Sequence, residues 1–362
     1  MEMCTGFFTG TDVSANNDIL RYPAACKSLE REMRLGLLAG PDGNWKESLE
    51  KVQIAEDMGV EFIAVGEAWS QSIIPWLSVL ATNTKKVRIG SAIHNVFSRT
   101  PAALAQEYSM LDELSEGRMV LGLGSSGEFV VEHFHGIPFK KPLTRIREYV
   151  EIFDTLISGE ALNYEGEIFQ MSRGFQLHYN RPRNKIPVYV AAITPKSIHQ
   201  TGAIADGIYP IHWPRGLFED LRSSLKEGAA TTDTPDKEFT IAPFTKVSIL
   251  DGTTDDEKWL EARGLIHHYV NRMGVFYWQM LERNGFEAEV GASRDAWAER
   301  DREKSILAIS DDMVRECQVI GSIEEVRAQL HERSDLGADV QMLYMPAGSP
   351  EDFKSWLSDI LA

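Results

Sequence analysis

The sequence predicts an α/β fold, built as a (β/α)8 TIM barrel with insertions at its rim. Eight short apolar runs, each followed by a stretch of helical character, organise residues 33–362. These runs are almost continuously apolar, which is typical of parallel strands covered on both faces. A strand–helix unit repeated eight times closes on itself more readily than it spreads out, so we expect a barrel; an open doubly wound sheet is the alternative.

The predicted strands are separated by turn-forming or helical segments. A loop at 40–44 ends the first strand, and Gly59 ends the helix that follows this loop. In chain order, the predicted strands cover residues 33–39, 62–66, 87–93, 119–123, 187–192, 208–211, 241–250 and 341–345.

Several predicted helices begin with capping residues. Thr100 precedes Pro101, and proline suits the first helical position because its missing N–H has no helical partner there. Ser322 and Glu325 form a capping box at the start of a later helix, which we expect to end at Gly337.

Two regions exceed the strand–helix repeat, and we expect them to be insertions, at about 125–185 and 251–320, in a single domain 33–362. The first surrounds a predicted helix at 143–158 and contains the alternating segment 162–169, whose glycine turn is typical of a hairpin. The second is helical, charged and rich in aromatic residues. Rim insertions of this kind wall a substrate pocket or build a dimer contact.

Composition limits the classes of partner. The chain of 362 residues is 43% hydrophobic and 25% charged, which is ordinary for a globular protein. Its net charge of −17 argues against nucleic-acid and anionic-membrane partners, because both require clustered Lys and Arg. Residues 1–32 lack the features of a signal peptide, and we expect an irregular N-terminal extension and a cytoplasmic location.

Neither the cysteines nor the histidines predict a metal site. Cys4, Cys26 and Cys317 show no metal-ligand spacing. His133 and His135 alternate as metal-binding histidines do in other barrels, but the further His and Asp that a metal-dependent hydrolase needs at strand ends are missing. We therefore expect no metal.

A set of motifs carries a family resemblance from Met33 onward. The motifs, in chain order, are VGEA at 65–68, IGSAI at 89–93, FSRTP at 97–101, LDELSEGR at 111–118, LGLGSSG at 121–127, HGIPF at 135–139, ADG at 205–207 and GSIEEV at 321–326. With these motifs in this order, the chain resembles the luciferase-like monooxygenase superfamily and, within it, the branch of oxidoreductases that depend on the deazaflavin coenzyme F420.

The resemblance implies a bacterial-luciferase-like barrel whose C-terminal rim holds the cofactor. It places a non-proline cis peptide between Ala92 and Ile93, behind the cofactor ring, where the small Ala92 permits close approach. A tapering strand end in a packed barrel is the alternative interpretation of this segment. The cofactor-binding residues expected on this basis are Gly66, Ser91, Ala92, Ile93, Gly122, Gly124, Ser125, Ser126, Ala192, Thr194 and Arg215.

The glycine-rich run 122–127 fits neither of two common nucleotide or nucleophile motifs. No Gly-Lys-Ser/Thr follows it, so it is not a Walker loop, and it lacks the spacing of a nucleophile elbow. By resemblance it lines the cofactor with backbone amides and hydroxyls; an ordinary strand-to-helix turn is the alternative.

Anion binding is expected late in the barrel. The helix that begins near Thr194 offers free backbone N–H groups, and Arg215 matches a position where relatives carry a basic residue against the cofactor phosphate. A solvated loop cation is the alternative role for Arg215. Lys246 is a second candidate.

The acid–base residues depart from the family pattern. Several relatives have an Asp-His pair after the second strand, where this chain has Glu67 and Ala68. The catalytic candidates are Glu67, His94 and Glu128. An internal salt bridge for Glu67, a structural histidine at His94 and an exposed first-turn carboxylate at Glu128 are the respective alternatives.

The resemblance implies an F420-dependent oxidoreductase that transfers a hydride between the deazaflavin and a small organic substrate. One alternative is an FMN-dependent monooxygenase that uses reduced flavin and oxygen, and another is a non-catalytic flavin-binding protein. The resemblance also implies a homodimer, because dimers are common in this family.

Overall fold

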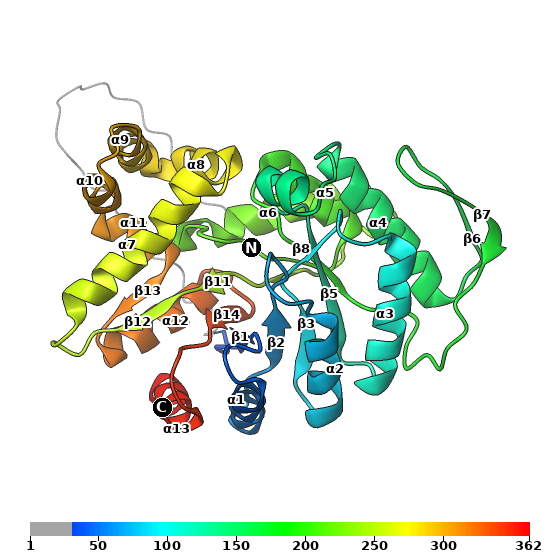
Figure 1. Ribbon diagram of the computed structural model, residues 1–362, viewed down its shortest axis with the longest axis horizontal. Helices are drawn as coiled ribbons and strands as arrows, with labels where there is room; N and C mark the ends of the chain where they lie inside the picture. Colours follow the sequence, from blue (N-terminus) through cyan, green and yellow to red (C-terminus); the bar gives the residue numbers. More distant parts are fainter. Residues whose placement is uncertain (1–30) are drawn as a thin grey trace, which may run out of the picture.

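The main sheet is parallel throughout. The computed structural model describes residues 31–362 and contains a ten-stranded sheet in the order β10-β9-β8-β5-β3-β2-β1-β14-β11, with β4 paired to β5 (Figure 1). Its strands are β1 (Leu35–Leu38), β2 (Phe62–Val65), β3 (Arg88–Ser91), β4 (His94–Asn95), β5 (Met119–Gly124), β8 (Val188–Val190), β9 (Gly207–Ile208), β10 (Thr240–Ile241), β11 (Phe244–Thr245) and β14 (Gln341–Tyr344).

The sheet is strongly curled. Its two end strands, β10 and β11, are separated in the chain only by Ala242 and Pro243, yet β10 pairs with β9 and β11 pairs with β14. The Ala242 amide donates to the Ile208 carbonyl at 2.9 Å, and the Pro243 carbonyl accepts from the Met342 amide at 2.9 Å. The two ends of the strand order therefore meet at one short segment.

Alternate residues of the strands pack into two separate hydrophobic cores. In β2, for example, Phe62 and Ala64 belong to a small cluster inside the curl, whereas Ile63 and Val65 belong to the larger cluster that also holds helix residues such as Leu77. The full inner cluster is Phe62, Ala64, Val120, Tyr189, Tyr209, Ala242, Val340 and Met342. The period of two along each strand thus separates the inside of the sheet from its helix-covered outside.

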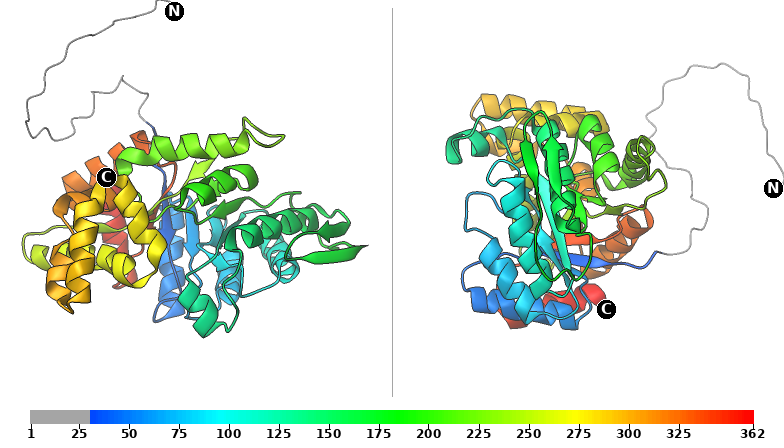
Figure 2. Two further views of the ribbon diagram at one scale, coloured as in Figure 1. Left: turned by 90° about the horizontal axis from the view of Figure 1, so that it is seen from above. Right: turned by 90° about the vertical axis from the view of Figure 1, so that its right-hand side faces the viewer.

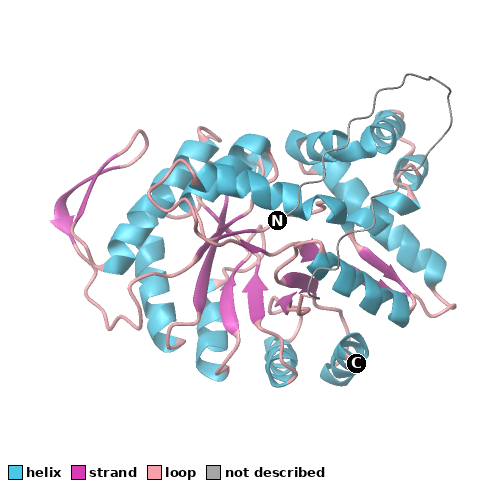
Figure 3. Cartoon of the chain, turned by 180° about the vertical axis from the view of Figure 1, so that it is seen from behind, coloured by secondary structure: helices cyan, strands magenta, loops and turns pink. Residues whose placement is uncertain are grey.

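Helices lie outside the strands (Figure 3). Thr100 caps α3 and accepts a hydrogen bond from the Ala103 amide, and Ser322 and Glu325 form the capping box of α12, as predicted. Gly337, which follows α12, has φ +118°. The helices of the repeat are α1 (Trp45–Asp57), α2 (Ile74–Asn83), α3 (Pro101–Leu114), α4 (Pro142–Ser158), α5 (Pro195–Ile204), α6 (Phe218–Ala229), α12 (Ile323–Asp335) and α13 (Pro350–Leu361).

Two additions extend to opposite sides of the sheet (Figures 1 and 2). One is the antiparallel hairpin β6 (Leu162–Glu165) and β7 (Gln170–Phe175), which extends the hairpin predicted at 162–169. The other, called here the helical excursion, covers residues 255–317. Its helices are α7 (Asp255–Arg272), α8 (Val275–Leu281), α9 (Glu287–Ala298), α10 (Arg302–Leu307) and α11 (Asp311–Cys317), and a π-helix, η3 (Glu282–Phe286), joins α8 to α9.

The predicted seventh strand, 241–250, was too long. At Pro243 the chain changes partner from β9 to β14, and after Thr245 it leaves the main sheet. The segment β12 (Val247–Ile249) pairs instead with β13 (Val319–Gly321), a strand that the sequence analysis missed. The predicted sixth strand is also shorter than expected, since only a single bridge joins Ile211 to Phe244.

Within residues 31–362, no helix has both the length and the apolar character needed to cross a membrane. Most of the expected N-terminal extension, with Cys4 and Cys26, lies outside the described residues.

Candidate functional site

The carboxyl ends of the strands share one edge of the sheet, because all strands of the sheet are parallel. The segments that follow β2, β3, β5, β8 and β9 therefore lie on that edge, called here the rim. It includes most of the residues predicted from sequence to bind a cofactor.

The segment after β3 has the backbone expected from the family resemblance. The peptide between Ala92 and Ile93 is cis, and both residues are half-buried. A Cβ on Gly124 would lie 2.9 Å from Cδ1 of Ile93, and a Cβ on Gly66 would lie 3.0 Å from the Ala92 carbonyl oxygen. Two of the predicted glycines thus leave room for this segment.

Ser91 and Gly122 serve the interior of the fold. The Ser91 hydroxyl donates to the Gly122 carbonyl at 2.9 Å and accepts from the Gly122 amide at 2.9 Å and the Tyr108 hydroxyl at 2.8 Å. These three bonds use the full capacity of a hydroxyl. A Cβ on Gly122 would overlap the Ser91 carbonyl oxygen. The Ser91 hydroxyl is therefore fully bonded within the protein, and Gly122 has no room for a side chain. Their predicted contact with the cofactor stays a prediction.

Glu67 is the centre of a polar group at the rim. Its carboxylate accepts from Arg99 through both oxygens, with Nη2 to Oε1 at 2.9 Å, and from the Ile73 amide at 3.3 Å. The His94 Nδ1 lies 3.0 Å from Oε2. Burial favours the protonated form, but hydrogen bonds from His94 and Arg99 outweigh it and hold the pKa of Glu67 well below its usual range. Glu67 is thus an ionised, paired carboxylate.

Arg99 is a site residue that the sequence analysis did not single out. Its Nε also lies 3.2 Å from the Glu107 carboxylate, so Arg99 joins the loop after β2 to α3. In the sequence it belongs to the motif at 97–101, directly before the Thr100 helix cap, but its pairing with Glu67 spans 32 residues and has no sequence signal.

His94 lies behind the rim. Its side chain is 1% exposed, its ring lies edge-on to Tyr108 with centroids 5.7 Å apart, and Nε2 is buried without a partner in the described residues. Burial lowers the pKa of His94 against the opposing effect of Glu67. This geometry fits a neutral histidine that positions Glu67.

The glycine-rich run ends in a loop between β5 and a π-helix. Ser125 and Ser126 are half-buried, and Ser126 has φ +59°. Glu128 is exposed and, within residues 31–362, forms no ion pair or hydrogen bond. It does not contact the Glu67 group.

The start of α5 keeps the arrangement predicted for anion binding. Ala192 is buried, and Thr194 and Ser197 form a capping box. Pro195 occupies the first turn, so the Lys196 amide is a remaining donor of that turn. Arg283 of the helical excursion reaches the same segment, with Nη2 3.4 Å from the Ile193 carbonyl.

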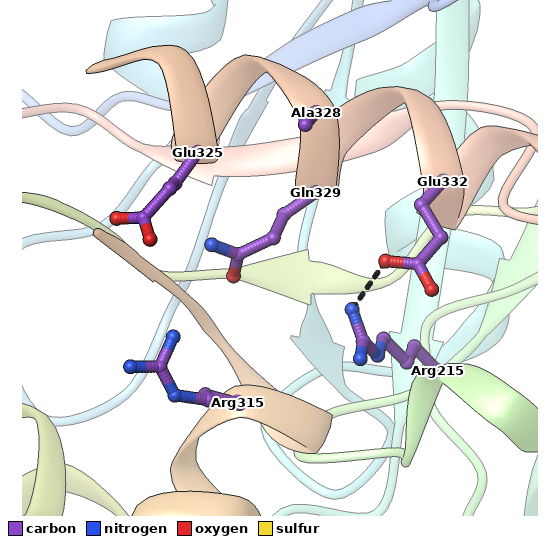
Figure 4. Close-up of a pocket in the computed structure, with 6 residues that line it drawn as sticks. All are labelled: Arg215, Arg315, Glu325, Ala328, Gln329 and Glu332. Carbon is purple, nitrogen blue, oxygen red and sulfur yellow. Dashed lines mark hydrogen bonds and ion pairs between the residues drawn. The ribbon is translucent and has the colours of Figure 1, made fainter. Parts of the chain in front are cut away.

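Arg215 lies in a different environment from the Glu67 group. Its guanidinium pairs with Glu316 of α11 at 3.2 Å. It also pairs with Glu332 of α12, beside a pocket of about 220 Å³ (Figure 4). The second cationic candidate, Lys246, pairs with Glu261 at 2.8 Å. Both cations therefore already have carboxylate partners.

No group of three or more His, Cys, Asp or Glu side chains within residues 31–362 is arranged to hold a metal ion. Cys317 is buried, and its Sγ lies 3.3 Å from the His212 carbonyl oxygen.

Comparison with known proteins decides the family. The sequence model for luciferase-like monooxygenases matches residues 31–340. The chain belongs to the luciferase-like monooxygenase family. A relative, the 5,10-methylenetetrahydromethanopterin reductase of Archaeoglobus fulgidus, is 27% identical to this chain over 89% of the chain and 96% of the relative. A Mycobacterium tuberculosis protein designated a coenzyme F420-dependent oxidoreductase, Rv3520c, is 29% identical over 90% of the chain and 98% of its own length.

Solved structures share the fold of this luciferase-like chain. The coenzyme F420-dependent tetrahydromethanopterin reductase of Methanopyrus kandleri superimposes with a TM-score of 0.76 at 21% identity, covering 91% of this chain and 99% of that chain. An F420-dependent secondary alcohol dehydrogenase, solved with an F420-acetone adduct, gives a TM-score of 0.69 at 19% identity, with the same coverage of 91% and 99%.

Proposed function

We propose that this chain is a coenzyme F420-dependent oxidoreductase that transfers a hydride between the deazaflavin ring and a small organic substrate. The observation that carries the proposal is its likeness, over 90% of its length, to a relative named as a coenzyme F420-dependent oxidoreductase. The rim geometry supports it.

The proposed scaffold is a closed (β/α)8 TIM barrel. Its support is the pairing of β10 and β11, neighbours in the chain, with opposite ends of the strand order. Alternate strand residues form the separate inner cluster. The interior of a closed barrel is packed with side chains in this way.

The rim residues fit a planar ring. Half-buried apolar side chains, Leu38, Ala92, Ile93, Ala191 and Phe244, adjoin the inner cluster. The nearby Glu67 is paired with Arg99, so it presents no uncompensated charge to a ring. We propose that the backbone at Ala92 and Ile93 supports one face of the ring.

The cofactor phosphate is proposed to bind at the start of α5. The Lys196 amide and the positive end of this ten-residue helix favour an anion, and Arg283 adds a cation beside Ile193. Arg215 would first have to leave Glu316 and Glu332, which makes it a weaker candidate for this role.

A bound deazaflavin would supply or take up the hydride, and a side chain of the protein would supply or take up the accompanying proton. The chain orients the reactants. Glu67 also holds the Ala92–Asn95 backbone through its amide, which donates to the Ile93 carbonyl at 3.3 Å. Among the three predicted catalytic side chains, only Glu128 is both exposed and unpaired within the described residues, so we retain it as the proposed acid–base group.

Titration of the purified protein with F420 and FMN, followed by absorbance, tests the proposal. We expect saturable binding of F420 and weaker binding of FMN. Tight FMN binding with none of F420 would instead support the flavin monooxygenase. We also propose that the protein is a homodimer and that it is located in the cytoplasm. Light scattering of the protein as it leaves a size-exclusion column measures its oligomeric state.

A further inference from the structure

A groove in the helical excursion takes no part in the site described above. It lies between α7, α10 and α11, at the end of the molecule opposite the β6–β7 hairpin (Figure 1). Its volume is about 470 Å³, and sites that bind a partner's side chains or a small molecule typically measure about 300–1,000 Å³. The groove is lined by Asp256, Trp259, Leu260, Arg263, Leu307 and Asp311.

Two leucines in the groove leave about half of their surface uncovered. Leu260 of α7 is 48% exposed, and Leu307, the last residue of α10, is 56% exposed. A single exposed leucine is ordinary on a protein surface, but these two line one hollow beside the Trp259 ring. Apolar side chains of a partner would remove this surface from water, which favours association.

Contacts within the excursion hold the groove in shape. The guanidinium carbons of Arg263 and Arg315 lie 5.3 and 5.1 Å from the centre of the Trp259 ring. Arg263 also donates to the Ile309 carbonyl at 3.0 Å and pairs with Asp311. Because these contacts tie α7 to α11 before a partner arrives, binding orders few further side chains of this chain.

The charged border of the groove is acidic. Asp311 is paired with Arg263, whereas Asp256 forms no ion pair or hydrogen bond within residues 31–362. The first turns of α7 and α11 add three neighbouring carboxylates, Asp255, Glu257 and Asp312. In a chain with a net charge of −17, this border attracts a basic partner and disfavours a second copy docked through the same groove.

The groove lies at the opposite end of α7 from the rim. Its α7 residues fall between Asp256 and Arg263, in the first half of the helix. The other end of α7 adjoins the rim, where a Cβ on Gly127 would lie 3.8 Å from the Met273 carbonyl oxygen. Arg263 and Met273 are about 15 Å apart along the helix axis, at a rise of ~1.5 Å per residue. A partner in the groove therefore leaves the proposed cofactor site open.

We propose that this groove docks a basic amphipathic helix of a partner protein. Three helices wall the groove and offer no strand edge, so a helix fits it better than an added strand. Apolar side chains of the partner cover Leu260 and Leu307, and flanking Lys or Arg side chains pair with Asp256 and the carboxylates beside it. The inference goes beyond the proposed function and does not depend on the redox reaction.

Fluorescence anisotropy of labelled peptides, with the full chain at about 0.15 M salt, tests this docking. The probe is a helical peptide of Leu, Lys and Ala, with leucines at positions i, i+3, i+4 and i+7. Saturable binding is expected. The dissociation constant is expected to rise at least about tenfold when every Leu is replaced by Ala, or every Lys by Glu.

Variants of the chain locate the binding. The double variant Leu260→Ser/Leu307→Ser is expected to weaken peptide binding about tenfold or more, and Asp256→Asn about two- to fivefold. The matched controls are Phe175→Ser, an apolar residue 71% exposed on the hairpin, and Glu160→Gln, an exposed carboxylate after α4. Both controls are expected to bind the peptide as the wild type does. Thermal melting checks that substitutions at these exposed positions leave the fold intact.

Hydrogen exchange with the bound peptide gives a second, local measurement. Amide exchange is expected to slow in the first half of α7 and in α10 and α11, and to stay unchanged in α5 at the rim. F420 titration of the double variant is expected to match the wild type, so the result for the groove is separate from the result for the proposed function.

Three outcomes overturn the inference. They are equal binding of the Lys and Glu peptides, wild-type peptide affinity in the double variant, and self-association of the wild type that the double variant abolishes. The last outcome would assign the groove to a second copy of this chain instead.

Discussion

At the scale of single residues, the rim depends on a few side chains that hold one another in place. The Glu67 carboxylate is hydrogen-bonded to Arg99, His94 and the Ile73 amide. The Ser91 hydroxyl uses its full hydrogen-bonding capacity with Gly122 and Tyr108. These polar groups stabilise the backbone that the cofactor is proposed to contact. Their substitution should therefore change stability as well as activity.

Replacing Arg99 with Met leaves the Glu67 carboxylate, with a side chain 13% exposed, without its counter-charge. We expect a loss of about 1–3 kcal/mol in the free energy of unfolding, measured by urea denaturation. Arg99→Lys, which keeps the charge but not the two-oxygen pairing, should lose less. An unchanged free energy in Arg99→Met would show that the pair contributes nothing net.

The pH dependence of stability should carry the signature of Glu67. Its folded-state pKa lies below the unfolded value of about 4.3, so its contribution is present above that pH and is lost as pH falls through the folded-state value. Glu67→Gln should flatten the loss of stability below about pH 4.3. Parallel denaturation profiles of the wild type and Glu67→Gln in acid would contradict this assignment.

Two glycines of β5 should respond differently to alanine. A Cβ on Gly122 would overlap the Ser91 main chain, whereas a Cβ on Gly124 would meet the movable end of the Ile93 side chain at 2.9 Å. We expect Gly122→Ala to lower the free energy of unfolding by about 3 kcal/mol or more, and Gly124→Ala by about 1 kcal/mol. Gly124→Ala should still weaken F420 binding, measured by titration, because Ile93 must shift. Equal thermal stability of the two variants would argue against this packing.

At the scale of elements, close contacts between helices decide which positions accept side chains. Helices α5 and α6 approach until a Cβ on Gly202 would overlap the Leu225 carbonyl oxygen, and one on Gly228 would overlap that of His199. The period of a helix predicts a buried face but not this distance. The same limit applies to the strand missed at 319–321, which is identified only by its pairing with β12.

Gly202→Ala and Gly264→Ala form a matched pair of helix substitutions. We expect Gly202→Ala to lower the free energy of unfolding by about 2–3 kcal/mol, since main chain must move. Gly264 of α7 has no atom within 4 Å of an added Cβ, so its substitution should raise stability by about 0.5–1 kcal/mol. Calorimetric melting of both variants checks the difference, and a destabilised Gly264→Ala would contradict it.

At the scale of the whole molecule, the helical excursion joins distant parts of the chain to the rim. Arg283 contacts Ile193 across 90 residues, and Tyr269 contacts His212. The hairpin β6–β7 lies on the other side of the molecule and takes no part in these contacts (Figure 1). The excursion, unlike the hairpin, therefore supplies candidate walls for a substrate.

The excursion should also help to bind the anionic part of the cofactor. We expect Arg283→Gln to weaken F420 binding about three- to tenfold, with a smaller effect on a deazaflavin that lacks the phosphate. Arg215→Gln, whose guanidinium already pairs with Glu316 and Glu332, should change the affinity less. Titration of the three proteins measures the order, and a larger effect at Arg215 would reverse the assignment.

The sequence by itself determined the features that depend on local order. Apolar runs and their spacing predicted the parallel strands, caps at Thr100 and Ser322 predicted helix starts, and the ordered motifs identified the family and the cis peptide at Ala92. These properties depend on neighbouring residues or on short patterns along the chain, so they can be recognised without knowing which segments meet in space.

Only the tertiary structure decided which side chains share a site. Arg99 was found as the partner of Glu67, His94 was found to be buried, and Arg215 was found between two carboxylates. Electrostatic pairing and burial depend on separations in space, and here they join groups 27 to 117 residues apart along the chain. A sequence without a fold does not contain those distances.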